Sequence, residues 1–282
     1  TKILIMNKFE VHEQLDKVIL VSDIYENWQA LKKIVDLPEY GKSDYTLVFL
    51  GDYTDANGSN LHEPIKVINF IMDQVKNHGA LAIHGNHDDM LYGTAIGDSD
   101  KFFNWGNNGI LETQELLGLT ANDVNIELTK NELNEKYSEY IDFLDEIPYA
   151  IEDQKRLFVH AGIDWTKNNY HDTAVEDLIW IREKYFFSNF SAASLYDPVK
   201  RPIVDKAWHR NTSNKVIVAG HTPSYFLSAD QSNPIVEMRN NQNDFSRYDI
   251  DGGSHSADIE AALNILILDK EGKEIRRDRL LA

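Results

Sequence analysis

The chain has 282 residues with a formal net charge of −18, and 42% of its residues are hydrophobic. This apolar share is enough for a buried core and excludes wholesale disorder, while the acidic charge excludes a general nucleic-acid-binding protein, because phosphate backbones attract basic surfaces. No cysteine is present, which excludes disulfides, thiolate metal sites and cysteine nucleophiles.

We expect no signal peptide, because Thr1 to Glu10 lacks a long apolar stretch after its charges. Nowhere does the chain reach the roughly 18 consecutive apolar residues that a membrane helix requires. Together with the absence of cysteine, these features lead us to expect a soluble, cytoplasmic protein with no membrane partner.

Short apolar runs that end in small or polar residues are typical of buried strands that lead into functional loops. In chain order, the predicted strands are Val18–Val21, Thr46–Leu50, Ala80–Ile83, Arg156–Val159, Val216–Ala219 and Asn264–Leu268. Helix-compatible stretches, Trp28–Val35 and Glu63–Asn77, separate the first three strands. This alternation predicts the α/β class.

The remaining segments are more polar. Residues from about 112 to 147, rich in Glu, Leu and Lys, predict a helical insertion, and Asp172–Phe186 predicts a second helical region. Asn240–Ser256 is predicted to be a loop. Because no internal repeat or linker is present, we expect one domain over residues 1–282.

Nearly every predicted strand is followed by a side chain able to bind a metal or move a proton. These side chains are Asp23, Asp52, Asn86, His160 and His221. Loops beyond the carboxyl ends of strands in open α/β sheets converge on one crevice. Mixed oxygen and imidazole donors suit Mn, Fe or Zn better than Mg or Ca. Two such ions about 4 Å apart, bridged by Asp52, could bind both the attacking and the leaving oxygens of a phosphoryl displacement.

At these positions the sequence resembles the calcineurin-like metallophosphoesterases, in the branch that holds Ser/Thr protein phosphatases and bacterial diadenosine tetraphosphatases. The blocks are Asp23–Tyr25, Gly51–Asp55, Gly85–Asp88, His160–Gly162 and Gly220–Pro223, and Trp105–Gly109 and Leu178–Glu183 resemble the bacterial members. The resemblance extends from about Val18 to Asp269. It implies two packed mixed β-sheets flanked by helices, and hydrolysis of a phosphomonoester, phosphoprotein or nucleotide polyphosphate.

The resemblance also implies a metal-binding role for the strand-end residues. Asp23 would bind the first of two ions and Asp52 would bridge both. The second site would be completed by Asn86, His160 and His221. A hydroxide held between two divalent or trivalent ions, Mn or Fe with Zn as an alternative, would attack phosphorus.

Further residues are implied to act on the substrate. His87 would protonate the leaving oxygen, oriented and kept cationic by Asp55. Arg182 would hold substrate oxygens with its fork of donors, beside Asn86.

Two positions depart from the family pattern. Tyr25 stands where the family has a histidine ligand, and a neutral phenol is a poor ligand for a divalent ion. Tyr25 could ionise against Fe(III), the first site could be weak, or another group could substitute. Packing or hydrogen bonding of Tyr25 near the site is slightly favoured over ligation. The unassigned candidates are His12, His62 and His255.

The second departure is Ala56, which stands where the phosphatase branch carries a phosphate-binding arginine. Asn57 or His84 could supply a compensating hydrogen bond. Both departures leave open an alternative function, that of a catalytically impaired metal- or phospholigand-binding protein. The pairing of His87 with Asp55 favours an enzyme, because an acid and its partner have no purpose in a pure binder.

Overall fold

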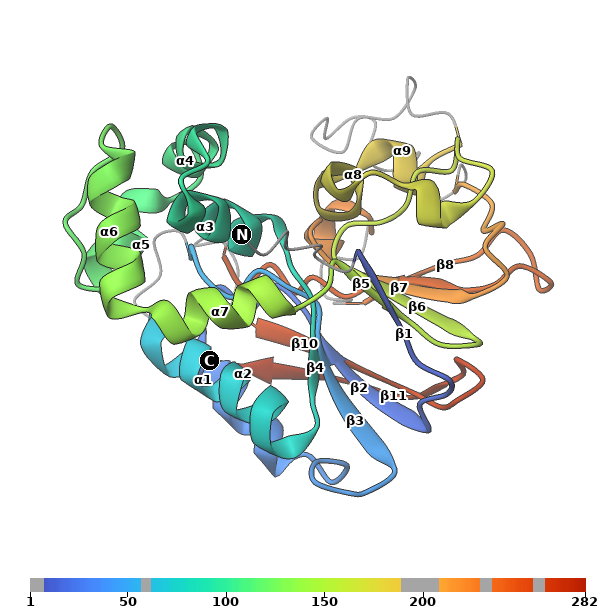
Figure 1. Ribbon diagram of the computed structural model, residues 1–282. Helices are drawn as coiled ribbons and strands as arrows, with labels where there is room; N and C mark the ends of the chain where they lie inside the picture. Colours follow the sequence, from blue (N-terminus) through green and yellow to red (C-terminus); the bar gives the residue numbers. More distant parts are fainter. Residues whose placement is uncertain (1–7, 57–61, 189–207, 229–234, 256–261) are drawn as a thin grey trace.

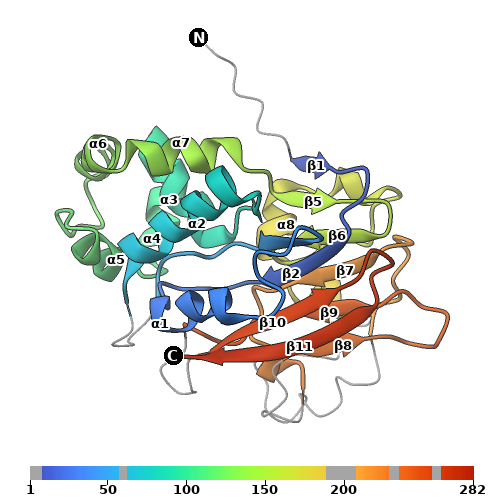
Figure 2. The same cartoon turned by 90° about the horizontal axis from the view of Figure 1, so that it is seen from below.

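Two β-sheets pack against each other, and helices cover their outer faces (Figures 1 and 2). This computed structural model describes residues 8–56, 62–188, 208–228, 235–255 and 262–282. The α/β architecture with two mixed sheets agrees with the sequence-based prediction. Within the described residues, no helix is long and apolar enough to cross a membrane.

The first sheet has the strand order β1-β5-β6-β7-β9-β8. Its strands are β1 (Phe9–Val11), β5 (Ala150–Glu152), β6 (Arg156–Val159), β7 (Val216–Ala219), β9 (Arg247–Asp249) and β8 (Val236–Met238). The pairs β1–β5, β6–β7 and β7–β9 are parallel, whereas β5–β6 and β8–β9 are antiparallel. The parallel run β6-β7-β9 brings three carboxyl ends to one edge.

The second sheet has the order β11-β10-β2-β3-β4. Its strands are β11 (Glu274–Leu281), β10 (Ala262–Leu268), β2 (Lys17–Val21), β3 (Tyr45–Phe49) and β4 (Leu81–Ala82). The three strands β2, β3 and β4 are parallel, and the β10–β11 hairpin adds to β2 antiparallel. Here too, three neighbouring carboxyl ends lie at the same edge.

The continuous apolar runs arise because the central strands are buried on both faces. In β2, Val18 and Leu20 pack into the core between the sheets, together with Phe158 of β6 and Val218 of β7. The alternate residue Ile19 faces the opposite way, into the core beneath the helices. The two-residue period of a strand thus serves two cores.

The helices are α1 (Trp28–Leu31), α2 (Pro64–His78), α3 (Asn86–Ile96), α4 (Ser99–Gly106), α5 (Ile110–Leu116), α6 (Ile126–Lys136), α7 (Ser138–Glu146), α8 (Val175–Trp180) and α9 (Glu183–Phe186). Helices α3 to α7 gather on one side, while α8 and α9 cover the first sheet (Figure 1). The predicted helical stretch 112–147 contains most of α5, α6 and α7. The helical region that contains this stretch begins earlier than predicted, with α3 at Asn86.

The prediction of a loop over Asn240–Ser256 is wrong in part, because β9 lies within it beside β7. This strand, Arg-Tyr-Asp, lacks the apolar signal of a buried strand. Its Arg247 is nonetheless buried, with the guanidinium 4.9 Å from the ring centroid of Tyr185 and donating to the Tyr185 carbonyl at 2.7 Å. Side-chain stacking and main-chain acceptors therefore replace hydrophobicity in burying this strand.

Candidate metal centre and active site

The predicted site residues come from strand ends of both sheets. Asp23 and Asp52 follow β2 and β3 by one or two loop residues, Asn86 begins α3 just after β4, and His160 and His221 follow β6 and β7. All five are at most 2% exposed. The crevice expected from the strand-end pattern therefore lies where the two sheets meet.

The loops that carry these residues adopt unusual backbone conformations. Asp23, Asp52 and His221 have positive φ angles of 52°, 58° and 67°. Residues other than glycine rarely adopt this left-handed backbone conformation, which costs about 1–3 kcal/mol of conformational free energy per residue. Residues in this conformation concentrate at functional sites. The backbone thus marks the same positions as the sequence motifs.

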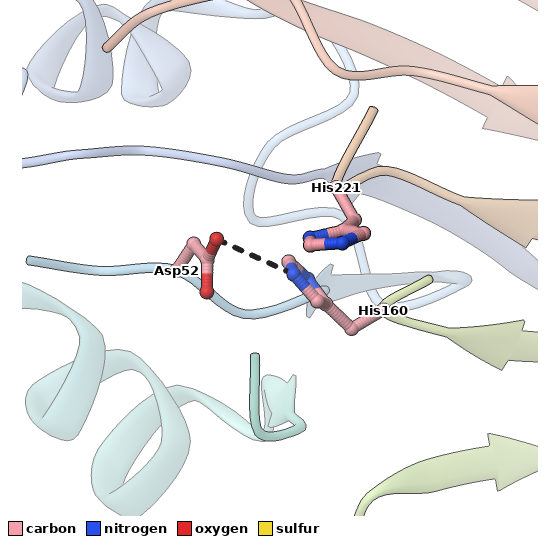
Figure 3. Close-up of side chains that lie close together, drawn as sticks. All are labelled: Asp52, His160 and His221. Atoms are coloured by element: carbon pink, nitrogen blue, oxygen red, sulfur yellow. Dashed lines mark ion pairs between the residues drawn. The ribbon is translucent and has the colours of Figure 1, made fainter. Parts of the chain in front are cut away.

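Three buried side chains converge closely enough to hold one metal ion (Figure 3). Asp52, His160 and His221 each offer a donor atom, and these atoms lie within 4.8 Å of one another. Among the residues that the structure describes, this is the one such group of three acidic or imidazole ligands. It unites β3 of one sheet with β6 and β7 of the other.

The hydrogen bonds of His160 leave its outer nitrogen facing two acceptors. Nδ1 lies 2.7 Å from the Leu50 carbonyl, a partner that requires a proton on Nδ1. Nε2 lies 3.0 Å from Asn86 Oδ1 and 3.3 Å from Asp52 Oδ2. Three electron-rich atoms meet only around a proton or a cation, and in the absence of an ion the carboxylates of Asp52 and Asp23 outweigh burial and raise the pKa of His160 to about 9. A metal ion could take the place of that proton.

His221 gives the clearest indication that this group of side chains can bind a metal ion. It is 2% exposed, and neither of its ring nitrogens has a hydrogen-bond partner within the described chain. Burial, with Arg182 and His160 adding to it, lowers the pKa of His221 well below its ordinary value, so the ring is neutral and has a free lone pair. An unpaired buried polar group is costly unless a ligand satisfies it. The donor set therefore fits a borderline ion such as Mn, Fe or Zn.

Asp23 lies beside this group without belonging to it. Its Oδ2 accepts hydrogen bonds from the Ser22 hydroxyl at 2.5 Å and from the His221 amide at 2.9 Å. Its Oδ1 is buried and has no partner in the described residues. Burial and the neighbouring Asp52 raise the pKa of Asp23 to about 6, although His160 opposes the rise.

Tyr25 contacts the carboxylate that was expected to bridge two ions. Its hydroxyl donates to Asp52 Oδ2 at 2.6 Å, and the residue is 5% exposed. Burial, followed by the charges of Asp52 and Asp23, raises the pKa of Tyr25 well above its ordinary value. In this structure the side chain is a neutral hydrogen-bond donor.

The expected acid and its partner lie together at the edge of the centre. His87 Nδ1 is 2.8 Å from Asp55 Oδ2, and the indole nitrogen of Trp105 donates to the same oxygen at 2.9 Å. Burial alone would lower the pKa of His87, but the carboxylates of Asp52 and Asp55 raise it to about 9. His87 is therefore protonated near neutral pH, as a general acid must be.

Glu26 supports this pair and was not singled out from the sequence. Its Oε1 accepts hydrogen bonds from the Asp55 amide at 3.0 Å and the Thr113 hydroxyl at 3.2 Å, and its Oε2 lies 2.8 Å from His62 Nδ1. Glu26 is fully buried and has a φ of 64°. The adjacent motif residues could have drawn attention to it, but an isolated Glu is usually a surface residue.

A cavity of about 200 Å³ opens onto the centre. It is lined by Tyr25, Asp55, Asn86, His87, Asn107, Asn108, Gly109, Trp180, Arg182, His221 and His255. Arg182 donates from one nitrogen to the His221 carbonyl at 2.9 Å and to the Thr222 hydroxyl at 3.0 Å. This contact orients the guanidinium at the wall of the cavity, where it could bind an anion.

Most groups considered as substitutes lie elsewhere. The His84 ring bonds the Leu144 carbonyl at 2.7 Å, and His12 and His62 pair with Glu10 and Glu26. Asn57 lies outside the described residues, and Ala56 is buried.

His255 differs from these groups. It lines the cavity, and its ring packs 4.9 Å from that of Tyr25, measured between centroids. It is the one substitute candidate found at the site within the described chain.

The loops meet at glycines that leave no room for a side chain. A Cβ on Gly85 would lie 2.1 Å from Asp52 Oδ1, and one on Gly220 would lie 2.1 Å from Asp23 Oδ2. Asp88 ties the first crossing, because its carboxylate accepts from the amides of Asp52 at 2.7 Å and Gly85 at 2.9 Å. These close approaches fix the loops relative to one another.

Comparison with known proteins agrees with this arrangement. The profile of the calcineurin-like phosphoesterase family matches residues 16–252. No curated protein matches the chain significantly.

Solved structures show the same fold at low sequence identity. A protein assigned as a diadenosine tetraphosphatase superposes with a TM-score of 0.57 at 14% identity, covering 97% of this chain and 98% of its own. A cold-active protein tyrosine phosphatase gives a TM-score of 0.51 at 15% identity, with coverages of 98% and 81%. A metallophosphoesterase from Sphaerobacter thermophilus gives 0.50 at 14% identity, with coverages of 94% and 87%.

Proposed function

Because this chain belongs to the calcineurin-like phosphoesterase family, we propose that it is a metal-dependent phosphoester hydrolase. The observation that carries the proposal is the His221 ring beside Asp52 and His160, whose two nitrogens have no hydrogen-bond partner among the described residues, with the protonated pair His87–Asp55 next to them. A metal-binding group and a positioned acid are the two parts that hydrolysis of a phosphoester requires.

The residues divide the chemistry between them. Asp52, Asn86, His160 and His221 would hold the ion, which when bound polarises a phosphoryl oxygen and lowers the pKa of water. The mixed oxygen and imidazole donors favour Mn or Fe, with Zn as an alternative. Whether a second ion binds depends on Tyr25, which is considered below.

The chain's own groups act on the substrate. Arg182, oriented by the His221 carbonyl and Thr222, neutralises phosphoryl oxygens in the cavity. His87 donates the proton from its outer nitrogen to the leaving oxygen, while Asp55 holds Nδ1 and so fixes the direction of transfer. Trp105 fixes Asp55 in turn.

The substrate class is a phosphomonoester, a phosphoprotein or a nucleotide polyphosphate. Similar structures carry the names of a diadenosine tetraphosphatase and a protein tyrosine phosphatase, and both substrates have an anionic phosphorus centre that suits Arg182. A binding protein without catalysis is the weaker reading, because the buried His87–Asp55–Trp105 chain serves proton transfer and not ion binding.

Hydrolysis of p-nitrophenyl phosphate, bis-p-nitrophenyl phosphate and diadenosine tetraphosphate with Mn, Fe or Zn present tests this function. We expect His87→Asn to slow hydrolysis by about 10²–10⁴-fold. The decrease should be smallest for the p-nitrophenyl esters, whose leaving groups need little protonation. His78→Asn is the matched control, since His78 is exposed at the end of α2. The proposal fails if all three substrates stay intact with every metal.

A further inference from the structure

We propose that the hydroxyl of Tyr25 takes the place of a first metal ion, so that the centre binds a single ion at Asp52, Asn86, His160 and His221. This inference rests on the proposed function, since it concerns the same site. It departs from the sequence-based expectation of two ions.

The hydrogen bonds of Asp52 are the first argument. Its Oδ1 accepts from the His87 amide at 3.0 Å, and its Oδ2 accepts from the Tyr25 hydroxyl at 2.6 Å. The same Oδ2 lies 3.3 Å from His160 Nε2, on the side of the ion site. Each carboxylate oxygen has two lone pairs, so Tyr25 uses the one on Oδ2 that a second, bridged ion would need.

The fixed position of the phenol is the second argument. The Tyr25 ring packs edge-on against His87, with centroids 5.3 Å apart, and in a tilted arrangement against His255, with centroids 4.9 Å apart. The Asn27 side chain donates to the Ser254 hydroxyl at 3.0 Å, and that hydroxyl lies 3.3 Å from the Ile24 carbonyl. Hydrogen bonds at Asn27 and Ile24 thus fasten the loop on both sides of Tyr25, while the two imidazole rings pack against the phenol beside Asp52.

Asp23 supplies the third argument. Two donors, the Ser22 hydroxyl and the His221 amide, already hold its Oδ2. Within the described residues it does not join any group of three acidic or imidazole ligands close enough to bind an ion. Asp23 therefore positions His221 through the backbone, and only its Oδ1 is left to face the place of a first ion.

The change from imidazole to phenol explains the difference chemically. An imidazole at position 25 would offer a lone pair to a cation, whereas the phenol offers a proton to a carboxylate. A donor in this place supplies part of the positive charge that Asp52 would otherwise receive from an ion. The electrostatic need for a second cation is reduced accordingly.

Counting the metal ions per chain tests the proposal without reference to activity. Full-length protein is saturated with Mn, freed of excess metal by gel filtration and analysed by inductively coupled plasma mass spectrometry. We expect one ion in the wild type, in Tyr25→Phe and in Asp23→Asn, two in Tyr25→His, and none in His221→Ala. Circular dichroism checks that each variant is folded, and if Tyr25→His does not fold, the wild type and Asp23→Asn decide the matter.

Two outcomes would overturn this inference and leave the proposed function standing. One is a wild type that binds two ions and loses one in Asp23→Asn while hydrolysis proceeds. The other is a visible charge-transfer band in iron-loaded protein that disappears in Tyr25→Phe, since this would make Tyr25 a tyrosinate ligand. A wild type that binds no ion and hydrolyses nothing would overturn the proposed function as well.

Discussion

The two sides of the crevice use their buried polar atoms in opposite ways. On the histidine side, formed by Asn86, His160 and His221, the ring nitrogens of His221 have no hydrogen-bond partner in the described part of the chain, and His160 Nε2 faces acceptors. On the tyrosine side, formed by Asp23, Tyr25 and Glu26, every carboxylate oxygen except Asp23 Oδ1 has a hydrogen-bond partner among the residues that the structure describes. The histidine side therefore has electron pairs available for a cation, whereas the carboxylate oxygens of the tyrosine side are mostly satisfied by hydrogen bonds.

The difference arises from two side chains in loops that follow strands β2 and β7. Tyr25 and His221 both stand in strand-end loops with positive φ, at 45° and 67°. The Tyr25 hydroxyl donates its proton to a carboxylate, whereas the neutral His221 ring has a lone pair available for a metal ion. The position after a strand thus places a side chain at the crevice. Whether that side chain binds a metal ion or takes the ion's place depends on whether its terminal group offers a lone pair or a proton.

Removing a ligand from the histidine side should have the largest effect. We expect His221→Ala to lower kcat/KM by about a thousandfold, because losing the ion removes several kcal/mol of transition-state stabilisation. Steady-state assays under saturating Mn measure the loss, with His78→Ala as control. A variant that keeps near-normal turnover would show that His221 is not a ligand and that the two sides do not differ as described.

Weakening the acid between the two sides should have an intermediate effect. Asp52 and Asp55 raise the pKa of His87 to about 9 against burial, and a bound ion lowers it again. Activity should therefore fall as His87 loses its proton, at or below about pH 9. In Asp55→Asn the pKa falls, so the alkaline limb should move to lower pH and the rate above it should drop by about a hundredfold.

The pH dependence of kcat/KM for wild type and Asp55→Asn measures this shift. Asp98→Asn is a suitable control, since Asp98 caps the exposed start of α4. An unchanged alkaline limb in Asp55→Asn would mean that His87 is not the acid.

The smallest effect is expected on the tyrosine side, at Glu26. Glu26→Ala leaves the buried Asp55 amide without its acceptor, at a cost of about 1–3 kcal/mol in stability. We expect a lower melting temperature and a decrease in kcat of about tenfold, with metal content unchanged, and largely restored values in Glu26→Gln.

Glu63→Ala is the matched control, because Glu63 is a nearby carboxylate whose partners Gln29 and Lys66 lie outside the site. If Glu26→Ala loses stability but keeps its kcat, Glu26 has a structural role only. If it loses bound metal, the tyrosine side contributes to the ion after all.

The sequence predicted the positions of the crevice residues better than their partners. Central strands buried on both faces leave continuous apolar runs, so the residues that follow them, such as Asp52 and His160, can be found without a structure. The Tyr25–Asp52 hydrogen bond joins residues 27 positions apart and depends on one side-chain orientation, which no local pattern encodes. A hydrogen bond of Tyr25 near the site was expected from the sequence, but its acceptor Asp52 was not.

Other elements escaped prediction for related reasons. Strand β9 is buried by stacking and main-chain acceptors around Arg247, not by apolar side chains. Glu26 gains its role from three segments that meet only in the fold, those of Asp55, His62 and Thr113. Each depends on contacts between distant parts of the chain.

The close crossings at Gly85 and Gly220 have a consequence for how this site can change over time. At these crossings the glycine main chain packs against the main chain of the neighbouring loop and against short acidic side chains. These contacts do not involve the residue at position 25. A new residue there can alter the chemistry without disturbing the scaffold, whereas a methyl group on either glycine would push the loops apart. Substitutions that diversify activity should therefore gather around these two glycines and spare the glycines themselves.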